Sequence, residues 1–350
     1  MKRKGKTIRN AIVFILLIIL TFYIILKDQN TDEIFKIIGT VKIQYVLIAV
    51  ISMCIYVICE SINIGRTLKA LNEKTTILNN IKYALIGFFF SGITPAASGG
   101  QPMQIYYMYK DKISVANSTL ALLINLSSMQ IVTISLALIG MIINHNIINT
   151  ALIWLFVIGI LLNASALSLL LIAIFSKKLL QKLINFVVKI MRKLKIKNIE
   201  QKEEKIQTEL GKYQNSSDYI KNNKFVIFKI IITTYIEFLA LYSVSYWVYC
   251  SFGLKEYNIL KIMSIQAVLY GTVSGIPSPG AVGVTEGGFI EIFKTVFPQS
   301  MINSAMILNR SINFYLLIIV SALITIVNAV KYQKLEKENN ENNTEKSWKK

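Results

Sequence analysis

Residues 91–104 read SGITPAASGGQPMQ and interrupt a stretch that is otherwise apolar. Residues 274–288 read SGIPSPGAVGVTEGG and interrupt a second apolar stretch in the same way. Four of the five prolines in the chain lie in these two passages. Proline lacks a backbone N–H and clashes with the preceding helical turn, so a continuous helix does not cross either passage. We therefore expect two helix–break–helix units.

The composition is that of a membrane protein. Of 350 residues, 54% are hydrophobic and 16% are charged, whereas a soluble domain carries about 25% charged residues. A hydrocarbon core of about 30 Å takes around 20 apolar residues in a helix. The sequence predicts an all-α polytopic membrane protein with about six full spans in one membrane domain over 1–330. The candidate spans are 11–26, 43–64, 113–143, 151–175, 225–252 and 303–330.

Loop charge predicts the orientation of these spans. Residues 176–224 contain thirteen Lys or Arg and five acidic residues, so this loop is expected to be cytoplasmic. If 84–109 crossed the membrane once, the basic loop would lie outside. If 84–109 enters and returns, the loop lies inside. We therefore expect re-entrant hairpins at 84–109 and 259–297 that enter from opposite sides, as in an inverted repeat; two closely packed full spans at each place are the alternative.

The basic residues have a topological explanation. The net charge of +19 is typical of a membrane protein whose cytoplasmic segments are rich in Lys and Arg, so no nucleic-acid partner is expected. Residues 177–197 predict an amphipathic helix on the inner leaflet of the plasma membrane. Residues 331–350 predict a disordered tail, rich in Asn, Glu and Lys. Both termini are expected to be cytoplasmic.

The breaks and the charges at membrane depth are candidate sites. A broken helix offers free N–H groups and the positive end of a dipole, which suit a phosphate head group. Thr285 is a possible cap, and Glu286 with Arg310 is either a functional pair or a neutralised structural one. Glu60 is expected to be solvated near the end of its span. The candidate binding residues are Pro95, Ser98, Gly99, Gly100, Gln101, Gln104, Glu237, Pro279, Gly280, Gly283, Thr285, Glu286 and Arg310.

Motifs for soluble chemistry are missing from the sequence. It contains no Gly-x-x-x-x-Gly-Lys-Ser/Thr, Gly-x-Gly-x-x-Gly or Gly-x-Ser-x-Gly motif, and it has a single histidine, His145. We therefore predict no cofactor, no metal site and no catalytic residues. The small residues in Gly271-x-x-x-Gly275 and Gly283-x-x-x-Gly287 are expected to permit close helix packing.

The ordered pair ITPAASGGQPMQIYYM and GIPSPGAVGVTEGG, followed by the Arg310 span, resembles the transmembrane region of lysylphosphatidylglycerol synthases, the flippase-like domain. The resemblance covers nearly the whole chain. It implies translocation of lipids, carried over to Pro95, Gly99, Gly100, Pro279, Gly280, Gly283, Glu286 and Arg310. Many relatives have an acidic residue and an arginine in the first motif, where this chain has Gln101 and Gln104, which puts the charge of the substrate in doubt.

Three functions follow as hypotheses. The leading one is a phospholipid translocator that handles anionic or aminoacylated phosphatidylglycerol-type lipids without ATP, as a homo-oligomer or with a separate synthase. The second is the membrane component of a phosphatidylglycerol lysyltransferase, a system linked to resistance to cationic peptides. The cytosolic transferase domain of the two-domain relatives has no counterpart in the sequence, so an autonomous enzyme is not expected. The third is an ion or solute transporter.

Overall fold

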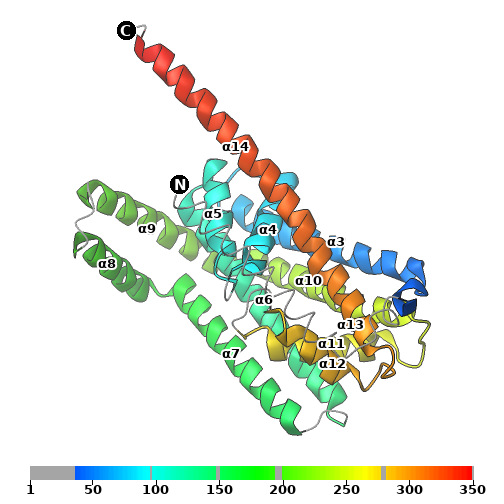
Figure 1. Cartoon of the computed structure of the whole chain (residues 1–350). Coiled ribbons are helices and arrows are strands. Elements are labelled where there is room, and N and C mark those ends of the chain that lie inside the picture. Colours follow the sequence, from blue (N-terminus) through cyan, green and yellow to red (C-terminus); the bar gives the residue numbers. More distant parts are fainter. Residues whose placement is uncertain (1–35, 95–96, 147–149, 194–198, 277–280, 349–350) are drawn as a thin grey trace.

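The computed structural model describes residues 36–94, 97–146, 150–193, 199–276 and 281–348, and these residues form a set of packed α-helices (Figure 1). The predicted span at 11–26 lies outside the described residues. A π-helix, η3 (Ser311–Tyr315), joins α13 to α14. The helices are α3 (Ile43–Ala70), α4 (Ile77–Gly92), α5 (Gly100–Lys110), α6 (Val115–Asn144), α7 (Thr150–Phe175), α8 (Lys177–Lys193), α9 (Ile199–Asn222), α10 (Lys224–Ser251), α11 (Ile259–Val273), α12 (Val284–Phe293), α13 (Ile302–Arg310) and α14 (Leu316–Trp348).

Several of these helices have the length and composition of membrane spans. Within the described ranges, 5 helical stretches qualify: Ile43–Ala70, Val115–Asn144, Leu152–Phe175, Lys224–Ser251 and Ile302–Tyr332. They carry many exposed large apolar side chains, which a soluble surface rarely collects but a lipid-facing surface requires. The chain is therefore an all-α polytopic membrane protein, as the sequence predicts.

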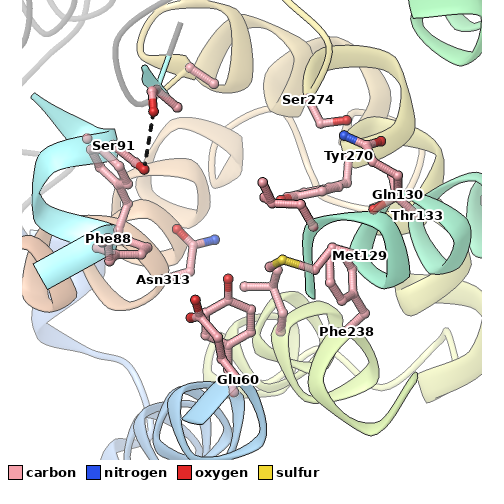
Figure 2. A pocket seen from close by; sticks show the side chains of 18 of the residues that line it. Glu60, Phe88, Ser91, Met129, Gln130, Thr133, Phe238, Tyr270, Ser274 and Asn313 are labelled. Carbon is pink, nitrogen blue, oxygen red and sulfur yellow. Dashed lines mark hydrogen bonds between the residues drawn. The ribbon is translucent and has the colours of Figure 1, made fainter. Parts of the chain in front are cut away.

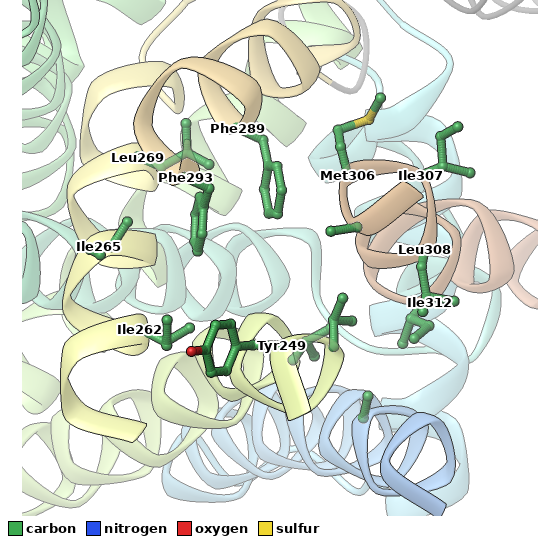
Figure 3. Packing of buried hydrophobic residues seen from close by; sticks show 14 of the residues in the cluster. Tyr249, Ile262, Ile265, Leu269, Phe289, Phe293, Met306, Ile307, Leu308 and Ile312 are labelled. Atoms are coloured by element: carbon green, nitrogen blue, oxygen red, sulfur yellow. The ribbon is translucent and has the colours of Figure 1, made fainter. Parts of the chain in front are cut away.

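Helix packing brings the two halves of the chain together. α3 runs along α10, α11 packs against α6, α7 and α10, and α14 packs against α4 (Figure 1). The largest apolar core fixes α12 in place (Figure 3). In that core Phe289 and Phe293 stack with their ring centroids 4.2 Å apart, and they face residues of α11 and α13. This packing anchors the helix that follows the second break.

The two predicted breaks are present. α4 ends at Gly92 and α5 begins at Gly100, while α11 ends at Val273 and α12 begins at Val284; in each unit the two helices pack on each other. The helix before each break is longer than half a bilayer: α4 has 16 residues and α11 has 15. At about 1.5 Å per residue these are roughly 24 Å and 22 Å long.

Side-chain caps explain where these longer helices start. Thr76 accepts a hydrogen bond from the backbone N–H of Asn79 at 3.3 Å, and Asn258 accepts one from Lys261 at 2.9 Å. Ser, Thr, Asn and Asp satisfy the orphan N–H groups at a helix start in this way. The sequence prediction started the first unit at residue 84, seven residues after the start of α4, and the second unit at residue 259, the first residue of α11.

The basic loop and the tail are helical. α8 and α9 lie beside each other at one end of the molecule (Figure 1), and α8 lies within the predicted amphipathic helix at 177–197. α14 continues to Trp348, through residues for which the sequence predicts a disordered tail. Its Lys, Glu and Gln residues have good helix propensity, so the helix continues past the apolar part.

Small residues let α11 approach its neighbours closely. A Cβ on Gly271 would lie 2.4 Å from the Cβ of Ala137, and one on Gly275 would lie 2.9 Å from the Cβ of Leu162. These two glycines therefore permit close packing, as expected. Gly159 on α7 approaches backbone instead, because a Cβ there would lie 2.5 Å from the carbonyl oxygen of Thr272. Gly287 differs from this expectation, since a Cβ there would meet no atom within 4 Å.

Gly159→Ala is expected to destabilise the protein by about 1–3 kcal/mol, because the added methyl group meets backbone that cannot rotate away. Gly287→Ala is the matched control. It places a methyl group in open space within α12 and is expected to stabilise that helix by about 0.5–1 kcal/mol. Thermal unfolding of both variants in detergent measures the difference. Equal Tm values for the two variants would contradict the close approach of α7 and α11.

Candidate functional site

A cavity of about 460 Å³ lies between the two breaks (Figure 2). Ala97 of the first break and Ala281 of the second both line it, together with residues of α3, α4, α5, α6, α7, α10, α11, α12, α13 and η3. Ligand pockets typically span about 300–1,000 Å³. The polar residues that line the cavity are Glu60, Ser91, Gln101, Gln104, Asn125, Gln130, Thr133, Asn163, Gln266, Ser274, Thr285, Arg310 and Asn313.

The chain takes up the same conformation at the end of both breaks. Ala97 and Ala281 each have a φ of 52°, in the left-handed region that non-glycine residues rarely occupy. A new helix starts three residues later in each case, at Gly100 and at Val284. Strained backbone of this kind persists where the surrounding structure enforces it, often at functional sites. The repeated conformation supports a structural repeat of the two units.

The second break is held by Glu286. Its Oε1 accepts a hydrogen bond from the Nε of Arg310 at 2.8 Å, and its Oε2 accepts the backbone N–H of Gly283 at 2.7 Å. The Tyr315 hydroxyl donates to Oε1 at 3.2 Å. Glu286 has a side-chain exposure of 0% and Arg310 of 7%. The two residues therefore form the buried pair that the sequence suggested, and Arg310 also lines the cavity.

Gly283, and not Thr285, occupies the cap position of α12, so the prediction of Thr285 as a cap is wrong. Gly283 has a φ of 87°, a conformation that glycine adopts without steric cost. The Glu286 carboxylate satisfies the N–H of Gly283, which leaves the Thr285 side chain without a capping role. Thr285 lines the cavity instead.

The first break is held by neutral groups. The Thr94 hydroxyl donates to the carbonyl of Phe90 at 2.6 Å and accepts the backbone N–H of Gly99 at 2.9 Å. Gly100 packs so closely on Ser91 that a Cβ would lie 2.0 Å from its Oγ. Ser98 is exposed and does not line the cavity.

The two glutamines of the first motif reach the cavity. Gln104 is buried, packs over Gly87, and donates from Nε2 to the carbonyl of Tyr83 at 3.1 Å. Gln101 is partly exposed and also lines the cavity. Pro95, Pro279 and Gly280 lie outside the described residues.

The structure places the acidic residues of the spans differently from expectation. Glu60 lines the cavity and is not a solvated residue at the end of its span, because α3 continues for ten residues beyond it to Ala70 (Figure 2). Glu237 is fully buried behind the cavity wall and does not line it. Glu60 is therefore a site residue that the sequence interpretation missed.

Polar amides inside the apolar spans complete the lining. The side-chain oxygens of Asn125, Gln130 and Asn313 accept no hydrogen bond from the described residues, although they are buried. Buried polar groups normally find partners, so these amides have unused hydrogen-bonding capacity toward a ligand in the cavity. Their position within otherwise apolar segments was a sequence signal that could have identified them.

A second polar cluster lies where Asp111 follows α5. Its carboxylate binds the Lys82 ammonium group and accepts hydrogen bonds from the hydroxyls of Tyr83 and Tyr332. Burial by itself raises the pKa of Asp111, but the hydrogen bonds from Lys82, Tyr332 and Tyr83 outweigh it and hold the pKa below its ordinary value. This cluster joins α4, α5 and α14 at the end of the first helix–break–helix unit that lies away from the break.

Asp111→Asn is expected to lower the Tm at neutral pH, because it removes the charge that Lys82 neutralises. A depressed pKa in the folded state stabilises the protein above the unfolded pKa of about 3.9, and this stabilisation is lost as the pH falls through the folded pKa. The Tm difference from wild type should therefore shrink in acid. Asp218→Asn is the control, since its ion pair with Lys177 is exposed and contributes little. A pH-independent difference for Asp111→Asn would contradict the prediction.

Arg310→Ala and Glu286→Ala are each expected to destabilise the protein by about 3–5 kcal/mol, because each leaves an uncompensated buried charge. The double variant Glu286→Leu/Arg310→Met replaces both charges with apolar groups and should unfold closer to the wild-type temperature than either single variant. Thermal unfolding in detergent tests this. Additive losses in the double variant would show that the two residues do not act as a pair.

The geometry can be compared with known proteins. A search of curated proteins finds no match to this chain. The model of the family described as "Lysylphosphatidylglycerol synthase TM region" matches residues 10–321. This range contains both breaks, Glu60, and the buried pair of Glu286 and Arg310. The chain therefore belongs to the family of the lysylphosphatidylglycerol synthase transmembrane region.

Proposed function

We propose that this protein translocates phospholipids across the plasma membrane, with head groups passing through the cavity between the two breaks. The carrying observation is that Arg310 and Glu60, a cation and an anion, line the same cavity. Charged side chains at membrane depth are costly and mark substrate pathways. A head group with a phosphate and an ammonium group offers the complementary charges.

The charge balance of the cavity favours an aminoacylated lipid over a purely anionic one. The guanidinium of Arg310 is already paired with Glu286, so it adds little net positive charge to the lining. Glu60 has no such counter-charge among the described residues. The unused amides of Asn125, Gln130 and Asn313 suit hydrogen-bond donors such as an ammonium group or glycerol hydroxyls.

In this proposal α4–α5 and α11–α12 are re-entrant hairpins that enter from opposite sides of the membrane. Irregular backbone at membrane depth is tolerated where protein or a water-filled cavity surrounds it, and both breaks border the cavity. The hairpins would move alternately, so that the head group is exposed to one leaflet and then to the other. The basic loop formed by α8 and α9 would face the cytoplasm.

Translocation can be measured with purified protein in liposomes that contain labelled phosphatidylglycerol or labelled lysylphosphatidylglycerol. Wild type should move the lysyl lipid faster than empty liposomes do. Arg310→Ala should slow this by about tenfold or more, because a hydrogen bond to a charged group contributes about 1.5–3 kcal/mol. Lys294→Ala removes an exposed positive charge at the end of α12 and is the control, with no change expected.

The double variant Glu286→Leu/Arg310→Met separates folding from function, because it is expected to fold while lacking the guanidinium. It should be as slow as Arg310→Ala. Movement of neither lipid above the empty-liposome level by wild type would overturn the proposed function. Wild-type rates in the double variant would remove Arg310 from the mechanism.

A further inference from the structure

Two acidic residues lie along the contact between α3 and α10. Glu237 has 0% exposure, and neither of its carboxyl oxygens accepts a hydrogen bond from any described residue. Glu60 lines the cavity and forms no ion pair or hydrogen bond with the described part of the chain. Phe238, the residue after Glu237 on α10, lines the cavity together with Glu60. This arrangement is unfavourable if both carboxyl groups are ionised.

A positively charged ligand would remove that cost. An unpaired buried carboxylate loses several kilocalories per mole of solvation, so it becomes neutral or binds a cation. In the described part of the chain no three His, Cys, Asp or Glu residues are placed so that they could hold a metal ion together, whereas Ca²⁺ takes six to eight oxygen ligands. A proton needs only the carboxyl oxygens that are present.

Among the described residues, no Lys or Arg forms an ion pair with either carboxyl group, so none competes there with a proton. The titratable groups that interact with the two carboxyl groups are phenols and one thiol, which are neutral at physiological pH. Arg66 lies two turns from Glu60 on α3 and is engaged by Asn63, Thr233 and the carbonyl of Lys229. Arg310, the basic residue of the cavity lining, is paired with Glu286. The phenols and the thiol belong to Tyr56 and Cys59 of α3, Tyr242 of α10 and Tyr270 of α11.

Beyond the two carboxyl groups, polar side chains continue along the same helix contact. Asn63 donates to the hydroxyl of Thr234 at 3.0 Å, and Thr234 is 3.0 Å from the hydroxyl of Ser128. Asn63 also accepts from Arg66 at 3.1 Å, close to the end of α3. Glu60, Asn63 and Arg66 are three residues apart and lie on one face of the helix. Polar side chains therefore line the contact of α3 and α10 from Glu60 to Arg66.

We propose that Glu60 and Glu237 form a proton-binding site that couples proton movement to lipid translocation; the coupling rests on the function proposed above. Glu60 takes up a proton from the cavity. The proton then passes to the Glu237 carboxylate, so that one O–H bond breaks as the other forms and no electrons are exchanged. Release toward Arg66 returns Glu237 to its ionised form. The movement of a head group past Glu60 would control which carboxyl group holds the proton.

The first experiment detects the proton directly, without transport. Infrared difference spectra of purified protein in H₂O and D₂O should show the carbonyl stretch of a protonated carboxyl group at neutral pH. Glu237→Gln should remove this band and remain folded, because glutamine is a neutral isostere of the protonated acid. Glu256→Gln changes an exposed loop residue and should leave the band unchanged. A band that is absent from wild type, or that persists in Glu237→Gln, overturns the proton site.

The second experiment tests coupling in liposomes that contain labelled lysylphosphatidylglycerol. A pH gradient should accelerate movement by wild type and by Glu256→Gln, whereas the ratio of rates with and without the gradient should fall to unity in Glu237→Gln and Glu60→Gln. A Na⁺ gradient of equal size should have no effect. Lipid movement by wild type that ignores the pH gradient, or that follows the Na⁺ gradient, overturns the coupling.

The two experiments separate this inference from the proposed function. If wild type moves no lipid at all, translocation and its coupling both fall, and the infrared band alone decides whether the proton site exists. If wild type moves lipid but the band does not depend on Glu237, translocation stands and the proton site falls. Size-exclusion profiles of every variant confirm that each remains folded before either measurement.

Discussion

The carboxylate of Glu286 accepts the Nε–H of Arg310 with one oxygen and the backbone N–H of Gly283 with the other. A single side chain thereby joins the start of α12 to the end of α13, 24 residues later in the chain. Both partners are needed because a buried charge without compensation is expensive in an apolar environment. The second break, the π-helical turn after Arg310 and one wall of the cavity all depend on this interaction.

The first break uses a different solution to the same constraint. Backbone groups that leave a helix inside an apolar environment must find partners within the protein. Thr94 supplies them at the first break with a single hydroxyl group, and Gln104 satisfies a carbonyl of α4. The two units therefore share a backbone conformation at Ala97 and Ala281, but among the described residues it is the second break that charged side chains hold. Among the described residues that line the cavity, Glu60 of α3 is the acidic one.

Polar side chains are concentrated in the cavity and not on the outward faces of the long helices. The outward faces of the long helices are apolar, whereas the cavity collects amides and hydroxyls from several helices. Along the contact of α3 and α10, polar residues continue from Glu60 toward Arg66. A membrane protein bears the cost of burying such groups where they contact a substrate or move charge. The proposed head-group binding in the cavity and the proposed proton binding at Glu237 would both follow from this arrangement.

The sequence by itself determined the fold class, the positions of the two breaks and the pairing of Glu286 with Arg310. The fold class and the breaks are local features, because apolar length sets which helices can span a membrane and proline and glycine set where a helix must stop. The apolar pattern did not show three other features. They are the full length of α4, the helical tail of α14, and the fact that Gly283 and not Thr285 caps α12. These features depend on capping side chains and on helix propensity. Only the tertiary structure decided that Glu60 faces a cavity and that Glu237 lies behind it without a partner among the described residues. Whether a side chain inside an apolar helix meets lipid, a neighbour or a cavity depends on residues far away in the sequence that pack beside it.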